Sequence, residues 1–129
     1  MKITNLDELT YFLIEKYKVE LKFIPEVRQD LKEINKGNRT RILALIIRRA
    51  QQGPLFVPDG VAKSLHGNLS GFAKIKSKST NIRCIYKPVN SSITRMEVIA
   101  IGPRDKSKAY KLAAERLESF ELARQNGKD

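Results

Sequence analysis

Three basic side chains on two neighbouring predicted strands could together bind an anion. Lys74 and Lys76 alternate with apolar residues, and Arg83 does the same on the next predicted strand. Because side chains point alternately to the two faces of a strand, we expect all three cations on one face. Like charges held close together repel one another, and an anion such as a phosphate would relieve that repulsion. An ordinary solvated face of a half-exposed sheet would give the same pattern.

The elements that must position these cations are predicted from the spacing of apolar residues. Helices are expected where apolar residues recur at helical spacing, over residues 5–17, 25–36, 39–52 and 105–122. Strands are expected where apolar and polar residues alternate, over residues 19–24, 72–77, 82–87 and 94–101. Residues 54–70 are rich in Pro, Gly and Asn and predict a loop. Gly37 is expected to end the second helix and Asn38 to cap the third.

This order of elements predicts an α+β fold. A single helix and strand are followed by two helices, a three-stranded meander and a last helix. Runs of this kind favour a small twisted, mainly antiparallel sheet with helices packed on one face. The other face would then be open to solvent and would carry the cations.

The net charge indicates a polyanionic partner. The 129 residues include 25 Lys and Arg against 14 Asp and Glu, which gives a formal charge of +11. So large an excess on a small domain attracts nucleic acid, although a generic basic surface has the same composition. Residues 61–116 hold 12 Lys or Arg against three acidic residues, whereas the first 60 residues are nearly balanced. We therefore expect the second half of the chain to meet the partner.

The sequence gives no sign of a metal, a cofactor or a membrane anchor. Cys84 is the only cysteine, which excludes an internal disulfide and a multi-cysteine zinc site. Its apolar neighbours favour a buried structural thiol over a nucleophile. No apolar run approaches the roughly 18 residues of a membrane helix, and Asp7 and Glu8 stand where a signal peptide would be apolar. We expect a cytoplasmic protein.

Three segments resemble the RelE/ParE superfamily of bacterial toxins. The segment AKIKSKSTNIRCIY, residues 73–86, is similar to the central hairpin of RelE-type toxins. LHG at residues 65–67 resembles the lead-in to that hairpin, and IAIGPRDKSKAY at residues 99–110 resembles the closing strand with its glycine, basic residue and tyrosine. The resemblance covers about residues 20–118. It implies a RelE-like fold with a four-stranded sheet and the toxin of a type II toxin–antitoxin system.

Carried over to this sequence, the resemblance implies an active site of Lys74, Lys76, Arg83, Arg104 and Tyr110. Family members of this type enter the ribosomal A site, where the ribose 2′-hydroxyl of mRNA attacks the adjacent phosphate and leaves a 2′,3′-cyclic phosphate and a 5′-hydroxyl. Lys74 and Arg83 would stabilise the pentavalent phosphate. Lys76 would take the proton, because neighbouring cations make a neutral lysine more accessible. Arg104 would assist the departing 5′-oxygen, and Tyr110 would position the nucleotide.

Other basic residues are expected to bind RNA or the ribosome: Lys78, Lys87, Lys106, Lys108 and Lys111. Lys78 and Lys106 stand where arginines are common in the family, and lysine lacks the bidentate geometry of arginine. Pro103 replaces a basic residue that is usual before the arginine. His66 is a further candidate for catalysis, although its place in a predicted tight turn favours a structural role. Tyr86 is expected in the core.

The resemblance also implies partners and a domain layout. The expected partners are mRNA in the ribosomal A site, the ribosome and an acidic antitoxin, with operator DNA bound only through the antitoxin complex. No membrane is involved. Residues 19–124 would form the toxin domain, residues 1–18 an N-terminal helical extension, and residues 125–129 a frayed tail.

Two other functions remain open. A ParE-like inhibitor of DNA gyrase would share the fold without nuclease chemistry, but such proteins generally lack the full set of lysines, arginine and tyrosine that this chain retains. A non-catalytic basic nucleic-acid-binding protein would bind without cleavage. The sequence lacks the aromatic platform of a single-strand binder.

Overall fold

The computed structural model describes residues 3, 5–53, 69, 71–77 and 79–126, and the predicted loop therefore lies almost wholly outside the described residues. The helices are α1 (Leu6–Tyr17), α2 (Glu26–Lys32), α3 (Lys36–Gln52), the 3-10 turn η2 (Asp105–Ser107), α4 (Lys108–Glu115) and α5 (Leu117–Asn126). The strands are β1 (Val19–Phe23), β2 (Ala73–Ser77), β3 (Ile82–Asn90) and β4 (Thr94–Pro103). None of the helices in the described part of the chain has the length and hydropathy of a transmembrane span.

The four strands form one twisted sheet in the order β1-β4-β3-β2. β1 pairs with β4 in parallel, and the other pairs are antiparallel. The predicted α+β class with a mainly antiparallel, four-stranded sheet is confirmed. In the described part of the chain β2 pairs with β3 alone, so β2 lies at the edge of the sheet.

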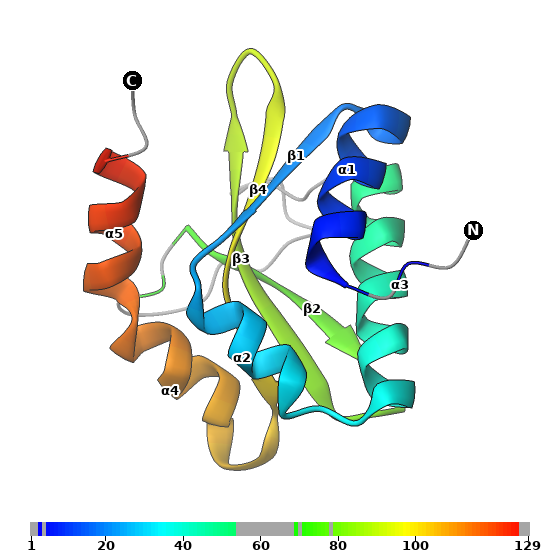
Figure 1. Cartoon of the computed structure of the whole chain (residues 1–129). Helices are drawn as coiled ribbons and strands as arrows, with labels where there is room; N and C mark the ends of the chain where they lie inside the picture. The colour runs from blue at the N-terminus through cyan, green and yellow to red at the C-terminus, as the bar shows by residue number, and fades with distance from the viewer. Residues whose placement is uncertain (1–2, 4, 54–68, 70, 78, 127–129) are drawn as a thin grey trace.

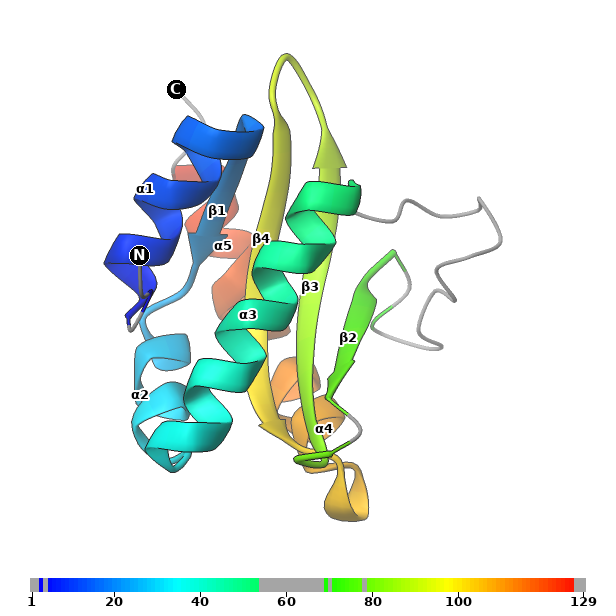
Figure 2. The same ribbon diagram turned by 90° about the vertical axis from the view of Figure 1, so that its right-hand side faces the viewer.

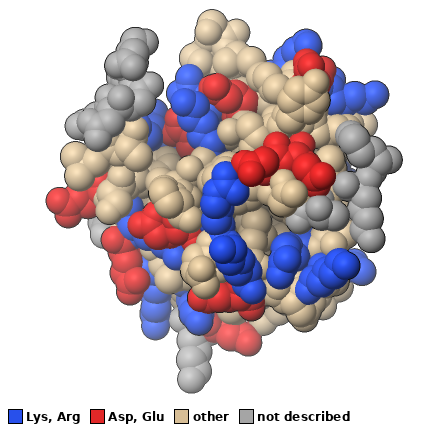
Figure 3. All heavy atoms as spheres, viewed as in Figure 1, with Lys and Arg blue, Asp and Glu red and all other residues tan. Residues whose placement is uncertain are grey.

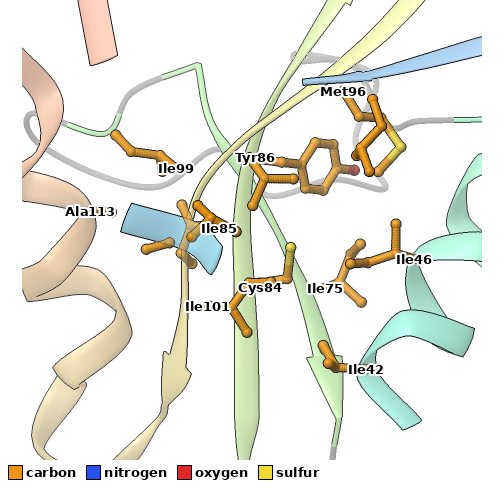
Figure 4. Packing of buried hydrophobic residues seen from close by; sticks show 14 of the residues in the cluster. Ile42, Ile46, Ile75, Cys84, Ile85, Tyr86, Met96, Ile99, Ile101 and Ala113 are labelled. Atoms are coloured by element: carbon orange, nitrogen blue, oxygen red, sulfur yellow. The ribbon is translucent and has the colours of Figure 1, made fainter. Parts of the chain in front are cut away.

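Helices cover both faces of the sheet, and not one face as the sequence led us to expect. Figures 1 and 2 show α1 and α3 on one side of the sheet and α4 and α5 on the other. On the first side Ile75 and Cys84 point toward Ile46 of α3, and on the second Ile85 points toward Ala113 of α4 (Figure 4). The physical reason is that β4 is buried at every residue from 96 to 102, and a strand covered on both faces is apolar at consecutive positions.

Two helix starts illustrate how asparagine side chains cap helices. Asn5 caps α1, because its side-chain oxygen accepts the Glu8 N–H at 2.8 Å. The third helix, α3, begins at Lys36 rather than after Asn38, because Asn35 accepts the N–H of Asn38 at 2.9 Å. A cap accepts from the N–H two or three residues further along. Asn38 is thus a donor within the first turn.

The last predicted helix is divided at Arg116, between α4 and α5. The Arg116 guanidinium donates to both carboxylate oxygens of Asp30, at 2.6 and 2.8 Å, and to the carbonyl of Ile99 at 3.1 Å. Asp30 also accepts the backbone N–H of Ile101 at 3.0 Å. This hydrogen bond from Arg116 to Asp30 raises the pKa of Arg116. The pair therefore joins α2, β4 and the junction of α4 and α5.

Substitution Asp30→Ala is expected to destabilise the fold strongly. It removes the partner of Arg116 and of the Ile101 N–H, and a buried charge left without a partner costs about 3–5 kcal/mol. Urea unfolding followed by circular dichroism measures the change. The matched control is Asp7→Ala, which breaks the exposed Arg28–Asp7 pair at 2.7 Å and should alter the midpoint little. Equal midpoints for the two variants would contradict the role given to Asp30.

Candidate anion-binding site

The hairpin of β2 and β3 holds the three predicted cations at fixed positions. Lys76 and Arg83 are directly paired across the two strands, and Lys74 is paired with Ile85. Residues paired directly across an antiparallel ladder share a face, and so do positions two apart on one strand. Lys74, Lys76 and Arg83 therefore lie on one face of the hairpin.

Helix α4 brings Tyr110 to the same face. Arg83 is paired with Gly102 of β4, and a Cβ atom on Gly102 would lie 3.3 Å from Leu112 Cδ1 and 3.7 Å from Ala109 Cα. The helix therefore passes close over the strand at this point. As a result Lys74 Nζ lies 5.9 Å from the centre of the Tyr110 ring, within the distance of a cation–π contact.

Arg104 follows β4 and is tied to the turn between β2 and β3. Its backbone N–H donates to the carbonyl of Asn81 at 2.9 Å. The Asn81 side chain in turn donates to Asp105 Oδ1 at 2.5 Å. Asn81 has a φ of 58°, a left-handed conformation that asparagine tolerates better than most residues. The Arg104 side chain is exposed, so the turn fixes its backbone and leaves its guanidinium in solvent.

Three cations of the site form no ion pair among the described residues. Arg83 is buried, with 7% of its surface exposed, and its guanidinium donates to the Ile82 carbonyl at 3.2 Å. Ion pairs among the described residues use Arg28, Lys87, Arg95, Arg116 and Arg124. None of these pairs includes Lys74, Arg83 or Arg104. Lys74, Arg83 and Arg104 therefore form no ion pair with a carboxylate in the described part of the chain.

The other predicted RNA-binding lysines are placed differently from one another. Lys108 and Lys111 are exposed on α4, the helix that carries Tyr110. Lys87 lies 4.0 Å from Glu121 and 5.7 Å from the Phe72 ring, so it is held by α5 and by packing within the protein. Lys78, His66 and the side chain of Lys106 lie outside the described residues. Tyr86 and Cys84 are buried in the core, as predicted.

Sequence reasoning missed two arginines of α3. A surface hollow of about 240 Å³ lies between α3 and β2, and its described lining is Leu45, Arg48, Arg49, Gln52, Lys74, Ile75 and Lys76. The first half of the chain thus places two arginines near the edge strand that carries the predicted lysines. The sequence does show two adjacent arginines near the end of an amphipathic helix. The apolar stripe of that helix indicates which of its sides is buried.

The chemistry open to this site is that of a cationic cluster. Among the described residues no group of three or more His, Cys, Asp or Glu side chains could hold a metal ion. The face seen in Figure 3 has basic and acidic side chains interspersed, so it does not present a field of one sign. The hairpin site, by contrast, combines several cations with an aromatic ring. Such a set binds an anion and stabilises negative charge that develops on it.

Comparison with solved structures agrees on the architecture. A mutant of the E. coli toxin RelE in which two arginines are replaced by alanine, in the free state, matches with a TM-score of 0.55 and 19% identity. The match covers 74% of this chain and 94% of that one. The isolated E. coli RelE toxin matches with a TM-score of 0.51 and 22% identity, over 75% and 96%. The chain has the RelE fold. No protein-family profile matches the sequence, and no curated protein matches it.

The RelE fold of this chain is also similar to a YoeB/ParE toxin from Agrobacterium tumefaciens. That match has a TM-score of 0.50 and 22% identity, and covers 65% of this chain and 97% of the other. The RelE fold therefore accounts for nearly the whole of each compared toxin. At such identities the likeness concerns the path of the backbone, and the chemistry must be argued from the side chains.

Cys84 is expected to be unreactive in the folded protein. Its side chain is fully buried, and burial together with the charge of Asp30 raises the pKa of the thiol far above its usual range. The thiolate, which is the reactive form, is therefore scarce even in mildly alkaline buffer. We expect a disulfide reagent such as DTNB to leave the native protein unmodified and to titrate one thiol after denaturation. Rapid modification of the native protein would contradict this burial.

Proposed function

We propose that this protein is the toxin of a type II toxin–antitoxin system in the RelE/ParE superfamily, and that it cuts mRNA in the ribosomal A site. The observation that supports the proposal best is the arrangement of Lys76 opposite Arg83, with Lys74 against the Tyr110 ring. These are residues that the sequence resemblance assigns to the active site, and they lie together within a RelE fold.

The reaction is an internal transfer of the phosphodiester. The 2′-oxygen of the ribose attacks the adjacent phosphorus as its proton passes to Lys76, and the bond from phosphorus to the 5′-oxygen breaks. The products are a 2′,3′-cyclic phosphate and a 5′-hydroxyl. Lys74 and Arg83 stabilise the extra negative charge of the pentavalent phosphate. Arg104 stabilises the departing 5′-oxygen, which takes up a proton from water to become the 5′-hydroxyl.

The surroundings of these residues suit those roles. Arg83 is buried, and a fixed charge stabilises a transition state more strongly where water is excluded. Lys76 is exposed, so an incoming ribose can reach it. Tyr110 is half-buried and presents its ring beside Lys74, where a nucleotide base can stack. The exposed Lys108 and Lys111 extend the basic surface along α4 toward the phosphates of mRNA or ribosomal RNA.

The proposal includes an antitoxin and a division of the chain. A cationic face attracts an acidic partner, and a partly disordered acidic antitoxin would be such a partner. Operator DNA would be bound through that complex. Residues 19–124 form the toxin domain in this proposal. Helix α1 is an extension that packs on it through the buried Leu6, Leu9 and Leu13.

Translation of a reporter mRNA by purified ribosomes tests the nuclease. We expect the wild-type protein to produce new 5′-hydroxyl ends within codons, which primer extension maps. Lys76→Ala should lower the cleavage rate by about 10²–10⁴, the usual contribution of a general base. Lys16→Ala, on the exposed side of α1, removes a charge far from the site and should cleave like wild type. Cleavage by Lys76→Ala at the wild-type rate would show that another group takes the proton.

A supercoiling assay with purified DNA gyrase tests the competing ParE-like function. The fold alone does not separate the two activities, because it is shared with a YoeB/ParE toxin. We expect gyrase to retain its activity at protein concentrations that abolish translation. Loss of supercoiling with intact mRNA would favour gyrase inhibition, and salt-sensitive RNA binding without either effect would favour a non-catalytic binding protein.

A further inference from the structure

The hollow between α3 and β2 has the features of a second anion site. Its described lining comprises Leu45, Arg48, Arg49 and Gln52 of α3 and residues 74–76 of the edge strand β2, and it includes no carboxylate. Ile75 points toward α3 (Figure 4), whereas the side chains of Lys74 and Lys76 lie on the opposite face of the hairpin. The volume of about 240 Å³ is of the order needed for a small group such as a phosphate with its sugar. Among the described residues no ion pair uses Arg48 or Arg49.

Arg49 lines this hollow, and its guanidinium forms no ion pair with a described carboxylate. One guanidinium nitrogen, Nη2, donates to Gln52 Oε1 at 2.6 Å, one turn further along the helix. The Nε atom is buried and has no hydrogen-bond partner among the residues that the structure describes. A buried donor without an acceptor costs free energy. The neutral amide of Gln52 therefore fixes the direction of the guanidinium and leaves its charge available to a ligand.

We propose that this hollow binds the phosphate and ribose of the RNA nucleotide next to the cleaved phosphodiester. The choice of RNA rests on the proposed function. The edge strand β2 carries the connection, because its residues 74–76 line the hollow on the side of α3, while Lys74 contacts the Tyr110 ring on the side of α4. An RNA strand held at Tyr110 and Lys76 on the reacting face would therefore reach Arg48 and Arg49 by crossing the edge of the sheet at β2.

The lining fits a nucleotide better than an acidic peptide. The guanidinium of arginine matches two oxygens of one phosphate, which lysine does not. Leu45 and Ile75 give the hollow an apolar part against which a ribose can pack. A carboxylate side chain would use the cations and leave that apolar surface unfilled. We therefore assign the hollow to RNA, and a protein ligand is an outcome that the experiment can detect.

The test measures binding of the full-length protein to a short 2′-O-methyl RNA, in which the attacking hydroxyl is blocked. Fluorescence anisotropy gives Kd as a function of salt for wild type and for Arg48→Ala/Arg49→Ala. We expect the double variant to bind about tenfold more weakly, and the salt dependence of log Kd to fall by about 1, as for the loss of one phosphate contact. Arg48→Lys/Arg49→Lys keeps the charge and should recover part of the affinity.

A matched control separates the hollow from the total charge. Lys16→Ala/Lys32→Ala removes the same charge from exposed positions of α1 and α2 and should bind RNA nearly as wild type does. Equal weakening in the two double variants would overturn the proposal, and so would unchanged binding in the arginine variant. If oligoglutamate binding depended on the two arginines while RNA binding did not, the hollow would belong to a protein partner. Circular dichroism verifies that each variant is folded.

The ribosome assay distinguishes failure of this inference from failure of the proposed function. If the wild-type protein cleaves no mRNA but loses RNA binding with the two arginines, the nuclease is wrong and the hollow remains an RNA site. If the wild type cleaves and the arginine variant binds and cleaves equally well, the hollow is wrong and the nuclease stands.

Discussion

Burial of β3 and β4 on both faces is the constraint on which the rest of the structure depends. Five successive residues of β3, from Ile82 to Tyr86, are buried, and so are seven of β4, from Met96 to Gly102. A strand buried on both sides cannot slip by one residue without exchanging the contacts of both helical layers. The register that sets Lys76 opposite Arg83 is therefore fixed by the core, and not by the cations themselves.

The same constraint explains why one carboxylate is buried near the centre. Because α4 crosses close above Gly102, the chain must turn at Arg116 before α5 can pack its Phe120 on Phe72, with ring centres 5.3 Å apart. Asp30 of α2 receives the Arg116 side chain there and also the N–H of Ile101. This interaction sets where α4 ends. It thereby also sets the position of Tyr110 along the helix.

Local patterns in the sequence were sufficient for most elements and for the hairpin of the site. The α1 stripe of Leu6, Leu9 and Leu13, and the alternation around Lys74, follow from periodicity that neighbouring residues alone determine. The covering of both faces was missed, although four consecutive apolar residues of β4, 98–101, carry its signal. The adjacent pair Arg48 and Arg49 was visible in the sequence, but its position beside β2 was not predictable. Which strand a helix crosses depends on long-range packing, whereas its own pattern fixes only its buried side.

The distribution of acidic residues supports the proposal that the charge at the hairpin serves to bind a ligand. Elsewhere in the described structure carboxylates pair with arginines: the buried Glu97 accepts hydrogen bonds from Arg95 at 3.2 Å and from Arg124 at 2.5 Å. Because Glu97 of β4 pairs with two arginines, an ordinary solvated polar face would also be expected to contain acidic residues among its cations. The hollow and the Lys74–Tyr110 contact contain none in the described residues. Repulsion among cations costs stability, and a ligand with closely spaced negative charges offsets that cost when it binds.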